Sequence, residues 1–441
     1  MEQINIQHYL PVITEWQNII AKVEGLIRAD QQELYAAAGS KPIKIVTGFR
    51  RSGKSFLVQM VARALIEAKK FSLGNVLYLN FEDYRLAQIN NIRDLDSIIQ
   101  NFLQESASGS KLLIFDEIQQ VMDWDKLIRT LYEKERDIEI FLTGSNSELL
   151  SSEIGSNLAG RFIEFKVFPF SFKEFLAYHE MHIENETKFY QQLTQIKLFF
   201  SQYIKFGGLP EIFSIKNENT KYSYLQGIVS KVILDDIVER FGVRQPIIIE
   251  KILNYLQAMI GNIVSPTKII HLLKSEGINI KQDTISTYIS YIVKTFAMYE
   301  ADRFDWKLNR IFNTNKKYYS VDTGIVNLFK GISNNYSKQI ENIVFLKLNK
   351  DFSNIYYGAM QNGKEIDFIA KDKSDVYHKY QVTLSLSDEN KTRELSSFYS
   401  SDHYLNKMNN ILLSMDEYDE MIHIDECIIS KKYLLKWLLD L

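Results

Sequence analysis

The segment GFRRSGKS at residues 48–55 constrains the fold more strongly than any other part of this sequence. The mostly apolar residues from Pro42 to Thr47 precede it and predict a short buried strand, and helical apolar spacing follows it from Phe56 to Leu65. A strand, a loop between two glycines and a helix N-terminus form a cradle for phosphate, because backbone N–H groups point at the anion. The alternative is an ordinary turn that contains two glycines.

The eight residues match the phosphate-loop pattern G-x-x-x-x-G-K-[ST] at all of its fixed positions. Gly48 and Gly53 would let phosphate approach the backbone. The Lys54 ammonium would reach the β- and γ-phosphates of ATP, and the Ser55 hydroxyl would bind Mg²⁺. The strand before the loop and the helix after it favour this interpretation over a chance match.

The pattern leaves the neighbouring residues of the loop less constrained. We assign Arg51, Ser52 and Phe56 to the same nucleotide site. For Arg50 and Arg51, contact with a phosphate or a neighbouring subunit competes with a solvated loop face.

Composition and charge argue against a strongly basic, a disulfide-rich or a membrane-spanning protein. The chain has 441 residues, enough for about three domains, and a formal net charge of −3, so any contact with nucleic acid must come from a local patch. The single cysteine, Cys427, excludes an intrachain disulfide framework and a cysteine-based zinc site. The start MEQINIQHYL lacks the features of a secretory signal, and no uncharged apolar run reaches ~18 residues. We therefore expect a cytoplasmic protein that makes no membrane contact.

A second motif supplies the acids that an ATP site needs. In KLLIFDE, residues 111–117, four apolar residues run into Asp116 and Glu117. Asp116 would hold the Mg²⁺ water shell opposite Ser55. Glu117 would orient and deprotonate the attacking water as a general base. The alternative is a strand end that caps the next helix.

Two further predicted strands, at 75–81 and 138–143, also end in polar residues. The C-terminal ends of parallel strands meet at one crevice, where an α/β sheet binds its ligand. Asn146, or Ser145 beside it, is the candidate to sense the γ-phosphate or the attacking water. Asn80 is a candidate to hold Glu117 inactive until a partner binds, although Asn also caps helices.

Long motifs give the chain a recognisable pattern. GFRRSGKS, LYLNFED at 77–83, LLIFDEIQQVMDWDKLIRTLYE at 112–133, the segment at 141–176 and YIKFGGLPEIF at 203–213 resemble the uncharacterised AAA-superfamily ATPases of bacteria and archaea. The resemblance implies a P-loop NTPase of the AAA type, with a parallel sheet and helices on both faces, followed by a domain of unknown function. It also implies that Walker A falls on Lys54 and Ser55, Walker B on Asp116 and Glu117, and sensor 1 on Asn146.

The resemblance draws attention to two more residues. Arg161, in LAGRF, is the candidate for an arginine finger that stabilises transition-state charge, often in an adjacent subunit. A surface salt bridge with Glu153 or Glu164 is the alternative. Pro210, in GGLP, resembles a Gly-x-Pro element that packs near adenine in related signalling ATPases, and a helix-ending turn is the alternative.

The middle of the chain, residues 221–330, has helical periodicity and then a predicted hairpin. Ser265 and Asp283 are expected helix caps, and the order helix, helix, recognition helix and hairpin is that of a winged helix. We expect DNA contact through this region, with protein docking as the alternative. The basic residues available for phosphate are interspersed with acidic ones, and they are Lys268, Lys274, Lys281, Lys294, Arg303, Lys307 and Arg310.

Residues 331–441 resemble the PD-(D/E)XK nuclease fold, an α/β fold of restriction-type nucleases. Glu341 matches the helix glutamate and Asp367 the strand aspartate, and Glu365 lies on the same strand face as Asp367. Gln381 stands where a glutamate ligand is expected, and Thr383 replaces the lysine. Because glutamine is a poor ligand for a hard dication, we expect an inactive binding or dimerisation module with a vestigial site.

These features predict an ATPase core with a small helical lid at 1–220, a winged-helix domain at 221–330 and a nuclease-like domain at 331–441. The leading hypothesis is a Mg²⁺-dependent, homo-oligomeric ATP hydrolase that acts on DNA. One alternative is a slow nucleotide-gated signalling switch that oligomerises and binds a protein partner. Another is an ATP-gated DNA nuclease.

Overall fold

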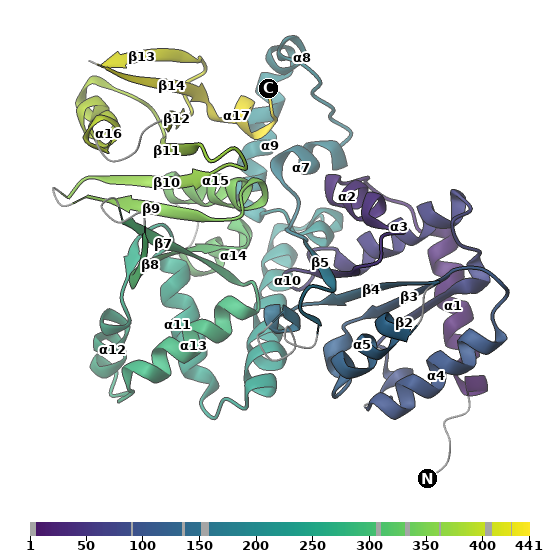
Figure 1. Cartoon of the computed structure of the whole chain (residues 1–441). Coiled ribbons are helices and arrows are strands. Elements are labelled where there is room, and N and C mark those ends of the chain that lie inside the picture. Colours follow the sequence, from purple (N-terminus) through teal and green to yellow (C-terminus); the bar gives the residue numbers. More distant parts are fainter. Residues whose placement is uncertain are drawn as a thin grey trace. The chain divides into compact units, whose positions relative to one another are not determined.

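The structure is a computed structural model that describes residues 6–89, 91–134, 137–150, 158–305, 310–330, 336–360, 363–401, 408–424 and 426–441. The chain forms two compact units, Met1–Phe168 with Lys294–Phe296, and Pro169–Val293 with Ala297–Leu441 (Figure 1). In the described ranges, no helix is both long and apolar enough to cross a bilayer.

The first unit is built on a parallel five-stranded sheet in the order β2-β3-β4-β1-β5. Its strands are β1 (Ile43–Thr47), β2 (Val76–Asn80), β3 (Lys111–Asp116), β4 (Ile138–Gly144) and β5 (Phe162–Lys166). The four strands β1 to β4 are almost continuously apolar and buried, as expected of a parallel sheet that helices cover on both faces. This is the P-loop NTPase fold, and it confirms the predicted fold class.

Helices pack on both faces of this sheet because alternate strand residues point to opposite sides. Ile45 and Leu113 belong to one apolar cluster, with residues of α4 and α5, and their neighbours Val46 and Ile114 belong to another, with residues of α3. The helices are α1 (Leu10–Lys22), α2 (Ala29–Ala37), α3 (Lys54–Glu67), α4 (Ile92–Glu105) and α5 (Trp124–Lys134). The 3₁₀ turns are η1 (Ile6–His8), η2 (Leu73–Asn75), η3 (Tyr84–Leu86), η4 (Ile118–Gln120) and η5 (Ser147–Leu150).

The second unit begins with helices. Three further helices lie between residues 246 and 294, where the sequence predicts them. Its helices are α7 (Phe172–Tyr178), α8 (Glu186–Gln191), α9 (Leu193–Phe206), η6 (Pro210–Ser214), α10 (Glu218–Lys231), the π-helix η7 (Val232–Glu239), α11 (Pro246–Ala258), α12 (Pro266–Ser275), α13 (Gln282–Lys294), α14 (Thr323–Lys330), α15 (Ser337–Asp351), α16 (Asp388–Ser401) and α17 (Leu434–Leu438). Ser265 caps α12 as predicted, by accepting a hydrogen bond from the Lys268 backbone N–H. Asp283 lies inside the first turn of α13, which begins one residue earlier.

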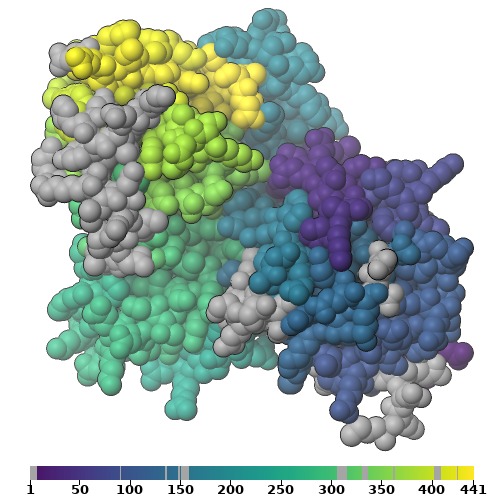
Figure 2. All heavy atoms as spheres, viewed as in Figure 1, coloured from purple at the N-terminus to yellow at the C-terminus, as the bar shows by residue number. Residues whose placement is uncertain are grey.

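One nine-stranded sheet runs through the second unit, in the order β13-β14-β12-β11-β10-β9-β7-β8-β6. Its strands are β6 (Ile263–Val264), β7 (Met298–Asp305), β8 (Arg310–Ser320), β9 (Ile355–Ala359), β10 (Glu365–Lys371), β11 (Tyr377–Thr383), β12 (Met408–Ser414), β13 (Glu420–Ile424) and β14 (Cys427–Tyr433). The hairpin β7–β8 joins the later strands because β7 pairs in parallel with β9, with Asp302 opposite Tyr356. The C-terminal strands lie on the surface of this unit (yellow in Figure 2).

The compact units do not follow the predicted domain limits. The main segment of the first unit stops at Phe168, so helices α7 and α9, which lie within the predicted 1–220 core, belong to the second unit. The predicted limit at 330 falls between two segments of one sheet. The assignment of a winged helix and a nuclease-like part within the second unit stays a prediction.

Candidate nucleotide-binding site

The loop between β1 and α3 has a backbone that requires both glycines of the pattern. Gly48 has a φ of 148°, and a Cβ placed there would lie 2.2 Å from the carbonyl oxygen of Val167. Gly53 has a φ of 97° and immediately precedes α3. Left-handed backbone favours glycine, and a carbonyl so close excludes a side chain, so the loop keeps this shape only with glycine at both positions.

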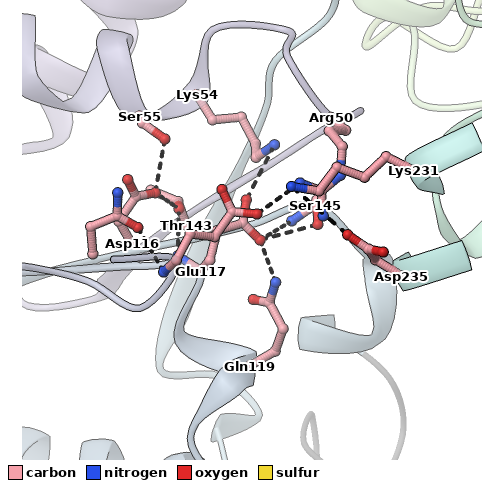
Figure 3. Close-up of polar contacts among 12 residues, drawn as sticks. Arg50, Lys54, Ser55, Asp116, Glu117, Gln119, Thr143, Ser145, Lys231 and Asp235 are labelled. Atoms are coloured by element: carbon pink, nitrogen blue, oxygen red, sulfur yellow. Dashed lines mark hydrogen bonds and ion pairs between the residues drawn. The ribbon is translucent and has the colours of Figure 1, made fainter. Parts of the chain in front are cut away.

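Lys54, the first residue of α3, turns its side chain into the loop (Figure 3). Its ammonium donates a hydrogen bond to the Phe49 carbonyl at 3.2 Å and lies 3.6 Å from the Glu117 carboxylate. The side chain is only 5% exposed. A buried ammonium at the N-terminus of a helix is positioned to meet phosphate.

The predicted Mg²⁺ ligands lie together at the C-terminal edge of the sheet. The Ser55 hydroxyl donates a hydrogen bond to Asp116 Oδ1 at 2.9 Å (Figure 3). Burial, and then the neighbouring Glu117 charge, raise the pKa of Asp116 above its usual value. A buried carboxylate destabilised in this way gains from a cation, and hydroxyl and carboxylate oxygens are ligands that Mg²⁺ accepts. These residues therefore fit a bound Mg²⁺.

Two residues that the sequence analysis missed hold Asp116 in place. Thr143 donates to Asp116 Oδ1, and the Tyr78 hydroxyl donates to Oδ2 at 2.5 Å. Strand register explains both contacts, since Phe115 pairs with Leu142 on one side of β3 and Asn80 with Asp116 on the other. Thr143 is a polar residue at the end of an apolar run, and this signal could have identified it. Tyr78 lies inside an apolar run and gives no such signal.

Glu117, the predicted base, is held by several donors. Its carboxylate accepts hydrogen bonds from the Ser145 backbone N–H at 3.1 Å, from the Ser145 hydroxyl at 3.0 Å, and from the Gln119 amide. Burial alone would raise the pKa of Glu117, but the Lys54 ammonium and these donors outweigh it and the pKa lies below its usual value. Glu117 is therefore ionised, as a proton acceptor must be.

Asn80 does not hold Glu117 among the described contacts, and that expectation was wrong. Its side-chain oxygen accepts from the backbone N–H of Glu82 at 3.0 Å, which is a local turn contact. The restraint on Glu117 comes instead from Ser145 and Gln119. Asn146 is fully buried and lies two residues after the end of β4, and its role as a γ-phosphate sensor stays a prediction.

The other loop residues differ in exposure. Arg50 is buried and forms an ion pair with Glu82 at 2.7 Å, so the solvated alternative is wrong for this arginine. Ser52 is buried, whereas Arg51 is exposed and Phe56 is 43% exposed. Contact of Arg51, Ser52 and Phe56 with nucleotide stays a prediction.

Arg161 lies beside the N-terminal end of β1, whereas the phosphate loop follows its C-terminal end. Its carbonyl accepts from the backbone N–H of Ile43, the first residue of β1, whereas Gly48 follows the last. Five strand residues span roughly 16 Å, so Arg161 does not meet the nucleotide site of its own chain. Its guanidinium pairs with Glu133 at 3.1 Å rather than with Glu164, and Glu153 lies outside the described residues.

Pro210 begins η6 in the second unit, and the glycines before it have a structural cause. A Cβ on Gly207 would lie 1.8 Å from the Asp322 carboxylate, and one on Gly208 would lie 2.2 Å from the Phe170 carbonyl. The two glycines of the GGLP segment are thus packed tightly against Asp322, the residue before α14, and against Phe170. Contact of Pro210 with adenine stays a prediction.

The predicted vestigial nuclease residues also meet, around a residue that the sequence analysis missed. Glu341, Glu365 and Asp367 surround the ammonium of Lys317, which comes from β8. Gln381 accepts a hydrogen bond from the Asp367 backbone N–H at 3.3 Å. In the described part of the chain, no set of three His, Cys, Asp or Glu side chains is arranged to hold a metal ion.

The chain resembles known proteins in sequence and in structure. Residues 40–176 match the family model of an AAA domain, and residues 198–336 match a domain of unknown function (DUF8612). The Walker-type ATPase of Pyrococcus abyssi is 15% identical, over 70% of this chain and 99% of that one, with a TM-score of 0.44. The Orc1 protein of Aeropyrum pernix, in complex with DNA, is 13% identical over 71% and 95%, with a TM-score of 0.31.

Two curated relatives cover most of the chain. An uncharacterised protein of Haemophilus influenzae is 32% identical over 410 residues, 93% of this chain and 97% of that protein. An uncharacterised protein of Methanocaldococcus jannaschii is 32% identical over 393 residues, 87% of this chain and 85% of that protein. With the AAA-domain match, these relatives confirm the resemblance found in the motifs. The chain therefore belongs to the family of bacterial and archaeal AAA-domain proteins that includes these two relatives.

Proposed function

We propose that this protein binds ATP with Mg²⁺ at the C-terminal edge of the β1–β3–β4 strands and hydrolyses it. The observation that carries this proposal is the hydrogen bond between Ser55 and Asp116 at 2.9 Å beneath a glycine-dependent loop, with the ionised Glu117 next in the chain. This arrangement unites a phosphate cradle, a cation site and a proton acceptor within one small region.

In the proposed reaction, ATP enters with its phosphates over the N-terminus of α3, and the Lys54 ammonium leaves Glu117 for the β- and γ-phosphates. Ser55 and Asp116 would hold Mg²⁺, which would supply positive charge to the phosphate oxygens. Glu117 takes a proton from a water molecule whose oxygen attacks the γ-phosphorus. The bond from that phosphorus to the bridging oxygen breaks, and ADP and phosphate leave.

Three variants test this proposal by ATP turnover and by nucleotide binding. Glu117→Gln should bind ATP with wild-type affinity and lose turnover by about 10²–10⁴-fold, because it removes only the base. Lys54→Ala should weaken binding itself. Glu67→Gln, an exposed carboxylate at the last turn of α3 that pairs with Arg63, is the matched control and should match wild type. Wild-type turnover in both site variants would refute the proposal.

We further propose that the second unit contacts DNA through α13. Gln282, Ser286, Thr287 and Ser290 are exposed on this helix, and polar side chains of this kind reach phosphates and base edges. Lys268, Lys274 and Lys281 nearby in sequence are also exposed. The measurement is DNA affinity at graded salt, which should fall steeply with ionic strength and fall again in Lys274→Glu combined with Lys281→Glu. Affinity independent of salt would refute DNA contact.

A slow nucleotide-gated switch with a protein partner is the second candidate. The observation that favours it is the restraint of Glu117 by Ser145, Gln119 and Lys54, which must be released before the base can act. ATP turnover with single-stranded, duplex and branched DNA distinguishes the two candidates. Stimulation by one DNA form supports action on DNA, and slow turnover that no DNA changes supports the switch.

A further inference from the structure

The PD-(D/E)XK resemblance of the C-terminal region implies a metal ion held by carboxylates, and the structure puts another cation there. Lys317 on β8 directs its ammonium into the carboxylates of Glu341 on α15 and of Glu365 and Asp367 on β10. The ammonium lies 3.6 Å from Glu341 and 3.9 Å from Asp367, and it forms a closer ion pair with Glu365. The Lys317 side chain is 1% exposed.

The carboxylates also have other partners that a metal would need to displace. Glu341 accepts a hydrogen bond from the Tyr319 hydroxyl at 2.9 Å, and it pairs with the Lys338 ammonium at 2.7 Å. Asp367 Oδ2 accepts from the Val382 backbone N–H at 2.9 Å. Both oxygens of Glu341 and one oxygen of Asp367 are therefore already engaged by nitrogen or hydroxyl donors.

Gln381, which replaces the usual glutamate ligand, is also engaged. Its side-chain oxygen accepts from the Asp367 backbone, and its amide donates to Glu394 at 3.3 Å. The residue that should complete a metal site instead bridges a strand and a helix. The donor set does not fit a catalytic dication.

Buried carboxylates need a cation, and here the chain supplies it. Burial, and then the charge of Glu341, raise the pKa of Asp367 to about 7. Burial alone would lower the pKa of Lys317, but the three carboxylates outweigh it and the pKa lies above its usual value. The Lys317 ammonium attracts the three carboxylates at these distances, and removing it would leave their buried charge uncompensated.

The same contacts join the hairpin to the later strands. Tyr319, two residues after Lys317, stacks on Phe345 of α15 with ring centroids 4.2 Å apart. Gly261, in the turn before β6, approaches Glu341 so closely that a Cβ would lie 2.7 Å from the carboxylate. The pairing of β7 with β9 adds backbone hydrogen bonds to these contacts.

We propose that Lys317 occupies the position of the metal, so that this cluster is an internal ion network that fastens the β7–β8 hairpin to α15 and β10 and carries no nuclease activity. The hairpin and the nuclease-like strands then move as one body. This inference does not depend on the proposed ATPase activity, because its tests use protein without nucleotide.

The first experiment measures Mn²⁺ binding to the nucleotide-free full chain by electron paramagnetic resonance, in wild type and in Asp367→Asn. We expect the two proteins to bind the same amount of Mn²⁺, since the cluster holds none. Loss of one bound Mn²⁺ in Asp367→Asn would overturn the proposal. The amide is nearly isosteric with the carboxylate, so the two proteins differ mainly in the charge at this position.

The second experiment compares the melting temperatures of Lys317→Met and Lys338→Met. Both lysines pair with Glu341, but Lys338 is 35% exposed, so it is the matched control. Lys317→Met should lower the melting temperature by roughly 10 °C, and Lys338→Met by much less. Added Mn²⁺ should raise the melting temperature of Lys317→Met by more than that of wild type, because only the variant leaves the carboxylates of this cluster without their ammonium. A Lys317→Met protein as stable as wild type would overturn the proposal, and if the variant does not fold, the Mn²⁺ comparison above decides.

Discussion

The Asp322 carboxylate accepts a hydrogen bond from the backbone N–H of Gly208 at 2.6 Å, across 114 residues of chain. It also accepts from the Gly324 backbone N–H at 2.8 Å. Asp322→Ala would leave these buried donors without an acceptor, at a cost of about 1–3 kcal/mol for each. We expect a large fall in the melting temperature of Asp322→Ala and a smaller one in Asp322→Asn, which keeps an oxygen acceptor.

The same carboxylate should make stability depend on pH. Burial raises the pKa of Asp322 from 3.8 to about 6, so the folded protein holds this proton more tightly than the unfolded chain does. Its contribution to stability should therefore fall as pH rises from about 4 to about 6 and stay constant above that. The measurement is the melting temperature of wild type minus that of Asp322→Asn. This difference should become smaller as pH rises from about 4 to about 6. A difference that does not change with pH would contradict the prediction.

Gln119→Leu should raise basal ATP turnover severalfold without changing ATP affinity. The substitution keeps the side-chain size but removes an amide donor from Glu117, so the base is released more easily and its pKa rises. Steady-state turnover and a pH–rate profile are the measurements, and the acidic limb of the profile should move to higher pH. Reduced turnover would instead show that Gln119 orients the base productively.

Tyr78→Phe should weaken the binding of ATP in the presence of Mg²⁺ more than in its absence. It removes the hydroxyl that donates to Asp116 Oδ2, and this donor orients the carboxylate toward Ser55. A hydrogen bond to a charged group contributes about 1.5–3 kcal/mol, so we expect roughly a tenfold or greater effect. The comparison is ATP affinity with and without Mg²⁺. Tyr35→Phe, a partly buried tyrosine on α2, is the control.

Arg161→Ala should lose turnover only if the protein assembles, because Arg161 lies at the sheet edge away from its own nucleotide site. In an oligomer, mixing Arg161→Ala with Glu117→Gln should restore part of the activity, since one mixed interface keeps both groups. Light scattering with ATP and turnover of the mixture check this. Equal turnover in wild type and Arg161→Ala would remove Arg161 from the active site.

The contiguous motifs could be predicted from the sequence, because a phosphate loop and an acid pair depend on residues that are neighbours in the chain. Gly48, Ser55 and Asp116 lie where their patterns predict. Tyr78 and Lys317 could not be predicted, because their roles depend on strand register that brings distant segments together. Lys317 was further hidden because it lies on β8, outside residues 331–441, where the nuclease resemblance was found.

The domain limits were hard to predict for the same reason. Helix periodicity and a hairpin in residues 221–330 describe a self-contained motif, and local patterns contain no sign that β7 will pair with a strand beyond residue 350. The pairing of β7 with β9 becomes visible only in the structure.

The β7–β9 pairing determines where this protein can be divided. A fragment that stopped near residue 330 would leave the backbone N–H and C=O groups of β7 along Asp302 to Phe304 without their partners on β9. An open, partly apolar strand edge of this kind pairs with strands of other chains, so the fragment would aggregate. Soluble fragments that contain the β7–β8 hairpin therefore need β9 as well.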